Sequence, residues 1–210
     1  MSGDIHTVER KGFRISVPDS WWEFDIHPQS RDDNIRRLVD ARVRAFPELA
    51  DSRDDLMHFL RNASADAWNS GALYCGCMAE TFGGELTVTG SVTVSVVGAQ
   101  TRGGEALSTD PLQIASQLKQ QEARREGDPW RKSTTVEIPD VGTVARTYGV
   151  EDIELPGEHR SVRAVLMQTF VPVPDSDDQV ALVAGSSQQV ELADSFFDIF
   201  DAVTSTLRFD

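Results

Sequence analysis

The strict alternation of residues 86–97 constrains the fold of this chain more than any other feature. From Leu86 to Val96, apolar residues and one glycine occupy every second position, while threonine and serine occupy the positions between them. A period of two places these sets on opposite faces of a β-strand. With residues 72–82 and the turn Gly83-Gly84, the segment predicts a long hairpin. One face of this hairpin is buried and the other is hydrated, as in an antiparallel sheet that is covered on one side at that point.

Further strands and helices are predicted on both sides of this hairpin. A strand is expected over residues 13–17, ended by Pro18, and four more over 133–138, 143–148, 162–173 and 180–187. Apolar residues at helical spacing predict helices over 30–46 and 54–69, and a polar helix over 110–125. The first two helices open with the same Ser-Arg-Asp-Asp tetrapeptide, whose serine is expected to act as the N-cap. No linker or low-complexity tract interrupts the chain, which predicts a single α+β domain over residues 1–210, an antiparallel sheet with helices packed on it.

The C-terminal helix has the clearest amphipathic pattern. Its apolar stripe consists of Leu192, Phe196, Ile199, Phe200, Val203 and Leu207. The opposite face carries Asp194, Asp198 and Asp201. Residues 150–210 hold 12 acidic residues and 3 arginines. Of all the segments in the sequence, this acidic face offers a basic protein partner the strongest electrostatic attraction. The alternative is that the face only keeps the protein soluble.

The overall charge excludes some classes of partner. The chain has 20 basic and 34 acidic residues, a formal charge of −14, with 40% hydrophobic and 26% charged residues. Such a composition is that of a globular protein. Its acidic balance repels phosphate backbones and anionic lipids, so we expect neither nucleic acid nor membrane as a partner.

Without a signal peptide or an apolar stretch of membrane-spanning length, the expected compartment is the cytoplasm. The scarcity of lysine among the basic residues hints at a GC-rich bacterial genome.

Two cysteines lie one residue apart, at Cys75 and Cys77. On a strand they point to one face, with Cβ atoms roughly 6–7 Å apart, which is too far for a disulfide. We therefore expect free thiols that act as small buried hydrophobes. Half of a zinc site is the alternative, but no histidine stands at a recognised spacing.

The sequence lacks the motifs of common enzyme classes. There is no glycine-rich nucleotide loop, no G-x-S-x-G nucleophile elbow and no H-E-x-x-H zinc motif. The four histidines are scattered, and His58 falls on the polar side of its helix. We predict no catalytic residue, no cofactor and no metal site, while enzymatic activity remains an alternative.

Three other residues are candidates for binding. Arg42 belongs to a cluster of arginines in the first helix but falls inside its apolar stripe. It is either the centre of an anion site or a long side chain that reaches past the core edge or pairs with a carboxylate. Trp21 and Trp22 follow the first strand. They either anchor the core or present one ring at an interface.

Two end motifs suggest a family. Phe-x-Ile-x-Val-Pro-x-x-Trp runs from Phe13 to Trp21, and Phe-Asp-x-Phe-Asp-x-Val-x-Ser-x-Leu-x-Phe from Phe197 to Phe209. Together they resemble the PsbP-like, or Mog-type, α/β/α sandwich, as do small uncharacterised proteins of high-GC bacteria. The resemblance implies a binding or assembly module without a shared catalytic site. The two N-terminal helices and the long polar hairpin depart from that type, so strand order stays open.

These observations favour a cytoplasmic, non-enzymatic binding or accessory protein. It would engage a basic protein partner through Asp194, Asp198 and Asp201, as an immunity-like or chaperone-like protein does. One alternative is an enzyme or binding protein for a small anion that uses Arg42 in a pocket. Another is a structural subunit of a larger assembly, in which the region of Trp21 and Trp22 is covered. The sequence leaves the oligomeric state open.

Overall fold

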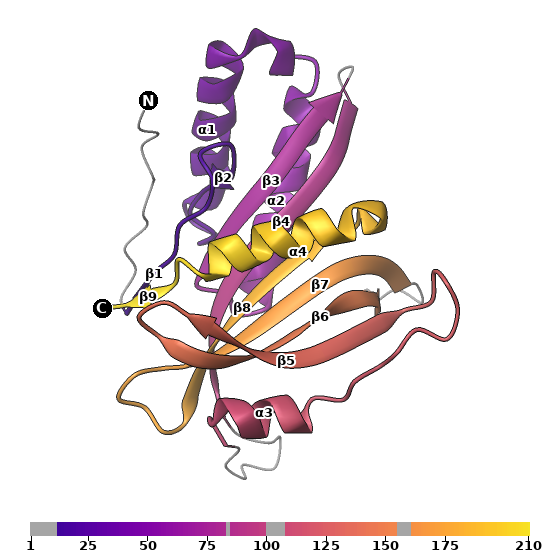
Figure 1. The fold of residues 1–210 in the computed structure, drawn as a ribbon. Helices are drawn as coiled ribbons and strands as arrows, with labels where there is room; N and C mark the ends of the chain where they lie inside the picture. Colours follow the sequence, from indigo (N-terminus) through magenta and orange to yellow (C-terminus); the bar gives the residue numbers. More distant parts are fainter. Residues whose placement is uncertain (1–11, 83–84, 100–107, 155–160) are drawn as a thin grey trace.

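Seven antiparallel strands form the central sheet (Figure 1). The computed structural model describes residues 12–82, 85–99, 108–154 and 161–210. Along the sheet the strands follow the order β2-β3-β4-β8-β7-β6-β5. Their bounds are Trp22–Glu23 (β2), Tyr74–Phe82 (β3), Glu85–Gly98 (β4), Trp130–Ile138 (β5), Gly142–Glu154 (β6), Ser161–Pro172 (β7) and Gln179–Ser187 (β8). The predicted α+β class, with helices packed on an antiparallel sheet, is confirmed.

The predicted hairpin is the pair β3 and β4. Val92 and Val94 are fully buried on one face of β4, while Ser91 and Thr93 on the other face are half-buried. The alternation therefore orients the strand as predicted. On its other side β4 pairs with β8, a strand far away in the sequence. This long-range pairing joins the hairpin to the meander β5–β8.

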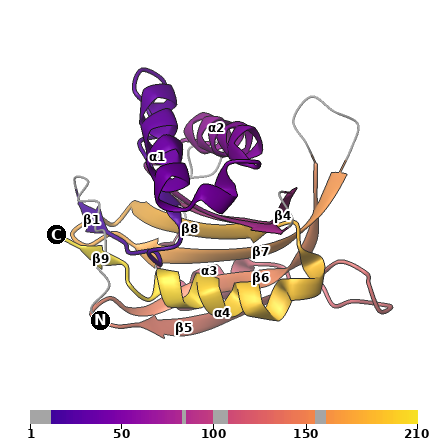
Figure 2. The ribbon, with the colours of Figure 1, turned by 90° about the horizontal axis from the view of Figure 1, so that it is seen from above.

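Helices cover both faces of the sheet (Figure 2). Helices α1 (Arg31–Ala45) and α2 (Arg53–Asn69), joined by the short helix η1 (Pro47–Leu49), lie on one face beside β2 and β3. Helix α4 (Ala193–Thr204), preceded by η2 (Val190–Leu192), lies on the opposite face, against β6, β7 and β8. The short helix α3 (Pro111–Gln117) packs near β5 and β6. The sheet thus separates two hydrophobic cores.

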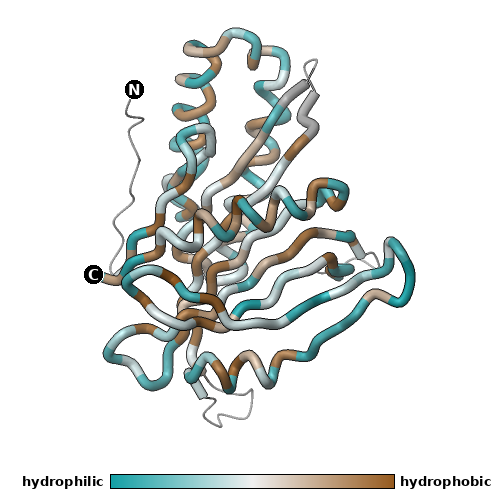
Figure 3. Tube along the Cα trace, viewed as in Figure 1, coloured by the Kyte–Doolittle hydropathy of each residue, from teal (hydrophilic) through white to brown (hydrophobic). Residues whose placement is uncertain are grey.

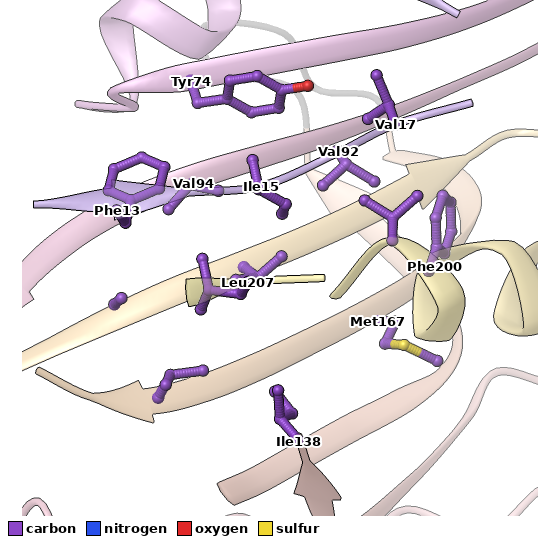
Figure 4. Close-up of a cluster of buried hydrophobic side chains, with 14 of the residues drawn as sticks. Phe13, Ile15, Val17, Tyr74, Val92, Val94, Ile138, Met167, Phe200 and Leu207 are labelled. Atoms are coloured by element: carbon purple, nitrogen blue, oxygen red, sulfur yellow. The ribbon is translucent and has the colours of Figure 1, made fainter. Parts of the chain in front are cut away.

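The larger core lies between the sheet and α4 (Figure 4). Its members alternate along the strands with residues of the other face, as strand geometry requires. They include Phe13, Ile15, Tyr74, Val92, Val94, Ile138, Met167, Phe200 and Leu207. Burial of these side chains holds α4 and both ends of the described chain on one face of the sheet.

The smaller core lies under α1 and α2. The helices contribute Ile35, Val39, Leu56, Met57, Leu60 and Ala67 to this core. The strands and the segments beside them contribute Trp22, Phe24, Ile26, Ala72, Cys75 and Cys77. The helical residues recur at intervals of three and four, which is why both N-terminal helices are recognisable in the sequence.

Glycine allows α4 to approach the sheet closely. A Cβ atom placed on Gly185 of β8 would lie 2.6 Å from Cδ1 of Phe200, and one on Gly90 of β4 would lie 2.7 Å from Cε1 of Phe196. Both values are far below a normal van der Waals contact. The two phenylalanine rings therefore occupy the space that side chains at these positions would fill.

The predicted first strand is shorter than expected. Only Phe13–Arg14 form strand β1, and it pairs with β9 (Arg208–Phe209) instead of joining the main sheet. Beyond it, the amide of Ser16 donates to Thr206 Oγ1 at 2.8 Å, and the single hydroxyl proton of Thr206 has two carbonyls within reach, that of Val203 at 2.7 Å and that of Ser16 at 3.2 Å. The Thr206 side chain therefore links Ser16 to the residues that follow α4. We call this pairing of the two ends the terminal clasp.

The polar helix is also shorter than predicted. Helix α3 ends at Gln117, and Leu118 has an extended backbone. The residues that follow are polar and cannot bury an apolar face, as the hydrophilic segment between α3 and β5 shows in Figure 3. Gln121 instead forms a bridge with Arg131. The polar helix therefore does not reach residue 125.

Two predictions about helix ends need correction. Neither Ser30 nor Ser52 makes a side-chain N-cap hydrogen bond; Ser30 Oγ donates to Asp25 instead, at 2.7 Å. The same carboxylate accepts from the amide of His27, so Asp25 organises the turn before α1. At the other end of the chain, Leu192 is 39% exposed and lies before α4. It is therefore not part of the buried stripe.

Candidate functional site

The two tryptophans proposed for an interface are core residues. Trp21 is 4% exposed and belongs to the larger core, while Trp22 is 1% exposed and belongs to the smaller one. Adjacent residues of an extended chain point to opposite sides, so the pair fills both cores at once. Neither ring is exposed, so of the two alternatives the structure supports the core role for both residues and gives no support to an interface role.

Arg42 stabilises the turn that carries these tryptophans. Its guanidinium donates to the carbonyls of Ser20, Asp19 and Trp21, at 2.9, 3.2 and 3.1 Å. The Cζ atom lies 4.1 Å from the centroid of the Trp22 ring, a cation–π contact. Burial lowers the pKa of Arg42 from its ordinary value. The donors that an anion would need are directed at backbone carbonyls, so the structure gives Arg42 an internal role and does not support the alternative of an anion site.

The three aspartates of α4 lie on one flank of the helix. Successive residues of an α-helix are rotated by about 100°, so Asp194, Asp198 and Asp201 follow one another around the helix beside Phe197. All three are exposed. Phe197 contacts Trp130 of β5 and Tyr148 of β6. The three aspartates lie on the side of α4 opposite the buried residues Phe196, Phe200 and Val203, so they face away from the sheet.

Asp201 differs from the other two aspartates because it has a buried partner. The Arg146 side chain of β6 is 6% exposed, and its Nη1 donates to Asp201 Oδ1. Its Nε donates to Thr169 Oγ1 of β7, at 2.9 Å. Asp201 thus links α4 to the sheet through an ion pair. Among the described residues, Asp194 and Asp198 take part in no ion pair.

An aromatic cluster borders the same flank. The rings of Trp130, Tyr148 and Phe197 pack edge to face, with centroids 5.3–6.0 Å apart. All three side chains are half-buried. Lys132 Nζ lies 5.7 Å from the Trp130 centroid. We define the α4–β5 surface as these three aromatic residues together with Asp194, Asp198 and Asp201.

The aromatic part of this surface was not predicted. The sequence does contain a signal for it, since the predicted strands 133–138 and 143–148 are joined by a tight turn. If the antiparallel pairing of these two strands is extended away from the turn, Trp130 pairs with Val150 and Lys132 with Tyr148. This register places Trp130 diagonally across from Tyr148 on one face of the sheet.

The cysteines lie where the sequence predicted them. Cys75 and Cys77 are buried free thiols on the face of β3 that α1 and α2 cover. Their sulfur atoms are 3.7 Å apart. The hydrogen bond with Cys75 and burial raise the pKa of Cys77 well above its ordinary value, which keeps this thiol protonated and unreactive. In the described part of the chain, no three His, Cys, Asp or Glu side chains are placed to hold a metal ion.

A cavity of about 450 Å³ opens in the segment between α3 and β5. Its lining consists of Gln120, Gln121, Glu122, Arg124, Asp128 and Pro129. Two carboxylates oppose one guanidinium there, so the cavity offers no net positive charge to an anion. It gives no support to the pocket that was the alternative to a protein partner.

None of the helices within the described ranges is both long and apolar enough to cross a membrane. No protein-family model matches the chain. No curated protein matches it either.

Proposed function

We propose that the protein is a non-enzymatic binding module of the cytoplasm that engages a basic segment of another protein through the α4–β5 surface. One observation carries the proposal: Asp194 and Asp198 are exposed carboxylates beside a half-buried aromatic cluster. Elsewhere in the described chain, many of the acidic side chains near arginine form ion pairs, as Asp40 does with Arg53 and Asp152 with Arg163. Unpaired acids next to aromatic rings suit lysine and arginine side chains, which gain both charge attraction and cation–π contact.

The fixed position of α4 supports the same proposal. The ion pair between Asp201 and Arg146 and the contact between Phe197 and Trp130 hold the helix against β5 and β6. A partner therefore meets charges that are already in place, and little ordering accompanies binding. The layered arrangement of helices and an antiparallel sheet agrees with the proposed PsbP-like relationship, whose members bind or assemble without shared catalysis.

The test compares two variants with the same change in net charge. Asp194→Lys/Asp198→Lys alters the α4–β5 surface, whereas Glu122→Lys/Asp177→Lys alters two exposed acids elsewhere. Each protein is used to capture partners from extracts of the source cells at low and high salt, with identification by mass spectrometry. We expect one basic protein that binds the wild type and the control at low salt and is lost from the α4 variant.

The melting temperature of each variant is measured alongside, so that loss of binding is not confused with loss of folding. A partner that binds the α4 variant as well as the wild type would exclude this surface as its site.

A further inference from the structure

Strand β5 forms one edge of the central sheet, and half of its backbone groups point away from the sheet (Figure 1). The amide of Arg131 donates to the Gln121 carbonyl at 2.6 Å, and the Gln121 amide donates to the Arg131 carbonyl at 2.9 Å. Both groups of Arg131 therefore point away from β6. Because the direction alternates along an antiparallel strand, the backbone groups of Ser133, Thr135 and Glu137 point outward as well.

These three residues form an open strand edge. Among the described residues, no hydrogen bond reaches the amide N–H of Ser133, Thr135 or Glu137. Two carbonyls accept long side-chain contacts, that of Ser133 from Gln120 Nε2 at 3.5 Å and that of Thr135 from Thr134 Oγ1 at 3.3 Å. The other edge strand of the sheet, β2, is two residues long. The outer side of β5 can therefore accept another strand.

The open edge is bounded at both ends. At the start of the strand, the bridge to Gln121 already uses the backbone groups of Arg131. At its end Pro139 follows the last strand residue, and proline has no amide N–H to donate. A strand added outside β5 thus finds three outward residues, with Thr135 in the middle.

An antiparallel copy of the same strand fits this edge. When Thr135 lies opposite Thr135 of the copy, Ser133 of each strand lies opposite Glu137 of the other. Opposite residues whose backbone groups face each other exchange two hydrogen bonds, so the three opposed pairs form about six. A shift of the copy by two residues in either direction sets an open residue against Arg131 or Pro139 and loses bonds. The centred register therefore satisfies the edge best.

The charges along β5 also fit an antiparallel copy. The start of the strand carries Arg131 and Lys132, its end carries Glu137, and Asp140 lies in the turn that follows. Residues 130–140 are therefore neutral, although the whole chain has a charge of −14. Two acidic chains repel each other least at such a neutral stretch. The antiparallel arrangement brings the basic start of each strand to the acidic end of the other, with Arg131 and Glu137 as diagonal neighbours on one face.

We propose that the protein pairs with a second copy of itself through residues 133–137 of β5, antiparallel and centred on Thr135, so that the two central sheets become one. The contact uses the same residues on both copies and closes at two chains. It is independent of the proposed function, because Asp194 and Asp198 face away from the sheet. A five-residue strand pair is a small interface, so we expect a dimer in exchange with the monomer.

Sedimentation velocity of the full chain over a series of concentrations measures the dimer dissociation constant. Thr135→Pro removes the central outward N–H of both copies, and proline is tolerated at edge positions of this kind. Thr135→Ala keeps the N–H and is the matched control. We expect Thr135→Pro to raise the dissociation constant at least tenfold and Thr135→Ala to leave it unchanged.

A disulfide between copies tests the register. Thr135→Cys places a thiol opposite the same residue of the second copy, at a Cα separation of about 5.5 Å, which suits a disulfide. Glu137→Cys is the matched control, because residue 137 lies opposite Ser133 and several residues away from its own copy. The native Cys75 and Cys77 are buried and do not compete. With oxidised glutathione, we expect Thr135→Cys to form covalent dimers at least tenfold faster than Glu137→Cys.

Three results would overturn the proposal. A wild type that stays monomeric up to about 1 mM excludes self-pairing. A dimer that Thr135→Pro leaves intact lies elsewhere on the molecule and excludes β5. If Thr135→Pro does not fold, the cross-linking rates decide, since equal rates for Thr135→Cys and Glu137→Cys exclude the register centred on Thr135.

Discussion

The regions on the two faces of the sheet use arginine differently. Under α1 and α2, Arg42 donates to three backbone carbonyls and stacks on Trp22, so its charge serves a turn of the chain. Under α4, Arg146 binds Asp201, and the neighbouring Asp194 and Asp198 remain exposed. In the first region the arginine is used up by contacts within the chain. In the second region two carboxylates are exposed and the neighbouring aromatic rings are half-buried. Clusters of charge in a sequence are therefore poor guides to binding until their partners within the chain are known.

The largest expected effect is the loss of stability when the buried Trp22 is replaced, a change on the face of the sheet away from the α4–β5 surface. Trp22→Ala removes a ring that is buried in the smaller core, and we expect it to lower the free energy of unfolding by about 3–5 kcal/mol. Trp68→Ala is the control, because Trp68 is exposed in the same region and should change stability by less than about 1 kcal/mol. Urea denaturation measures both values. If the folded fraction of Trp22→Ala bound the partner more weakly, the two regions would not be independent.

A smaller effect distinguishes the aspartates of α4. Asp201→Lys leaves the buried Arg146 guanidinium without its carboxylate and adds a like charge, so we expect a loss of about 2–3 kcal/mol in the free energy of unfolding. Asp198→Lys should change stability by less than about 0.5 kcal/mol. Of the three aspartates, Asp201 is therefore the one whose charge reversal affects stability as well as the acidic surface. Equal stability of the two variants would show that the ion pair contributes nothing.

Arg42 provides the next comparison. Arg42→Met removes three hydrogen bonds to the turn before β2, and we expect a loss of about 1–2 kcal/mol in the free energy of unfolding. Arg44→Met, on the exposed side of α1, is the control. A thermal-shift screen against anionic metabolites should show no stabilisation of the wild type. An anion that stabilised the wild type and not Arg42→Met would restore the anion-site interpretation.

The smallest effect concerns the thiols under α1 and α2. The Cys77 pKa is raised in the folded protein, so its stabilising contribution is complete below the unfolded pKa of about 8.5 and is lost as pH rises above it. Between pH 7 and about pH 9 we expect a decrease on the order of 0.5–1 kcal/mol in the free energy of unfolding. Cys77→Ala should reduce this slope. Rapid reaction of the native protein with a thiol reagent would contradict the buried position of the pair.

The sequence predicted the elements whose signals are local. The alternation of residues 86–97 and the stripe from Phe196 to Val203 each repeat over a short stretch, so β4 and α4 were recognised before any tertiary contact was known. The ends of α3 and β1 were not, because they depend on distant partners. Gln121 bonds to Arg131, and Ser16 bonds to Thr206. Tertiary contacts therefore overrode the local pattern at these ends.

The candidate site was predicted in part for a related reason. Asp194, Asp198 and Asp201 share a helix flank that helical periodicity alone places. That Asp201 pairs with Arg146 depends on which strands α4 covers, and this in turn depends on the pairing of β4 with β8. The burial of Trp22 and the donors of Arg42 likewise depend on how α1 packs on β2 and β3. These facts require the strand order, which no local pattern encodes.

The terminal clasp has a consequence for how the protein is made. β1 leaves the ribosome before the seven strands of the central sheet, whereas its partner β9, and α4 just before it, leave after the last of those strands. Until residue 204 is released, the apolar face that includes Val92, Val165 and Val183 has no helix to cover it. The nascent chain therefore carries an apolar, β-rich surface while β3 to β8 are being made. A chaperone that binds apolar strands would have its best opportunity during that interval.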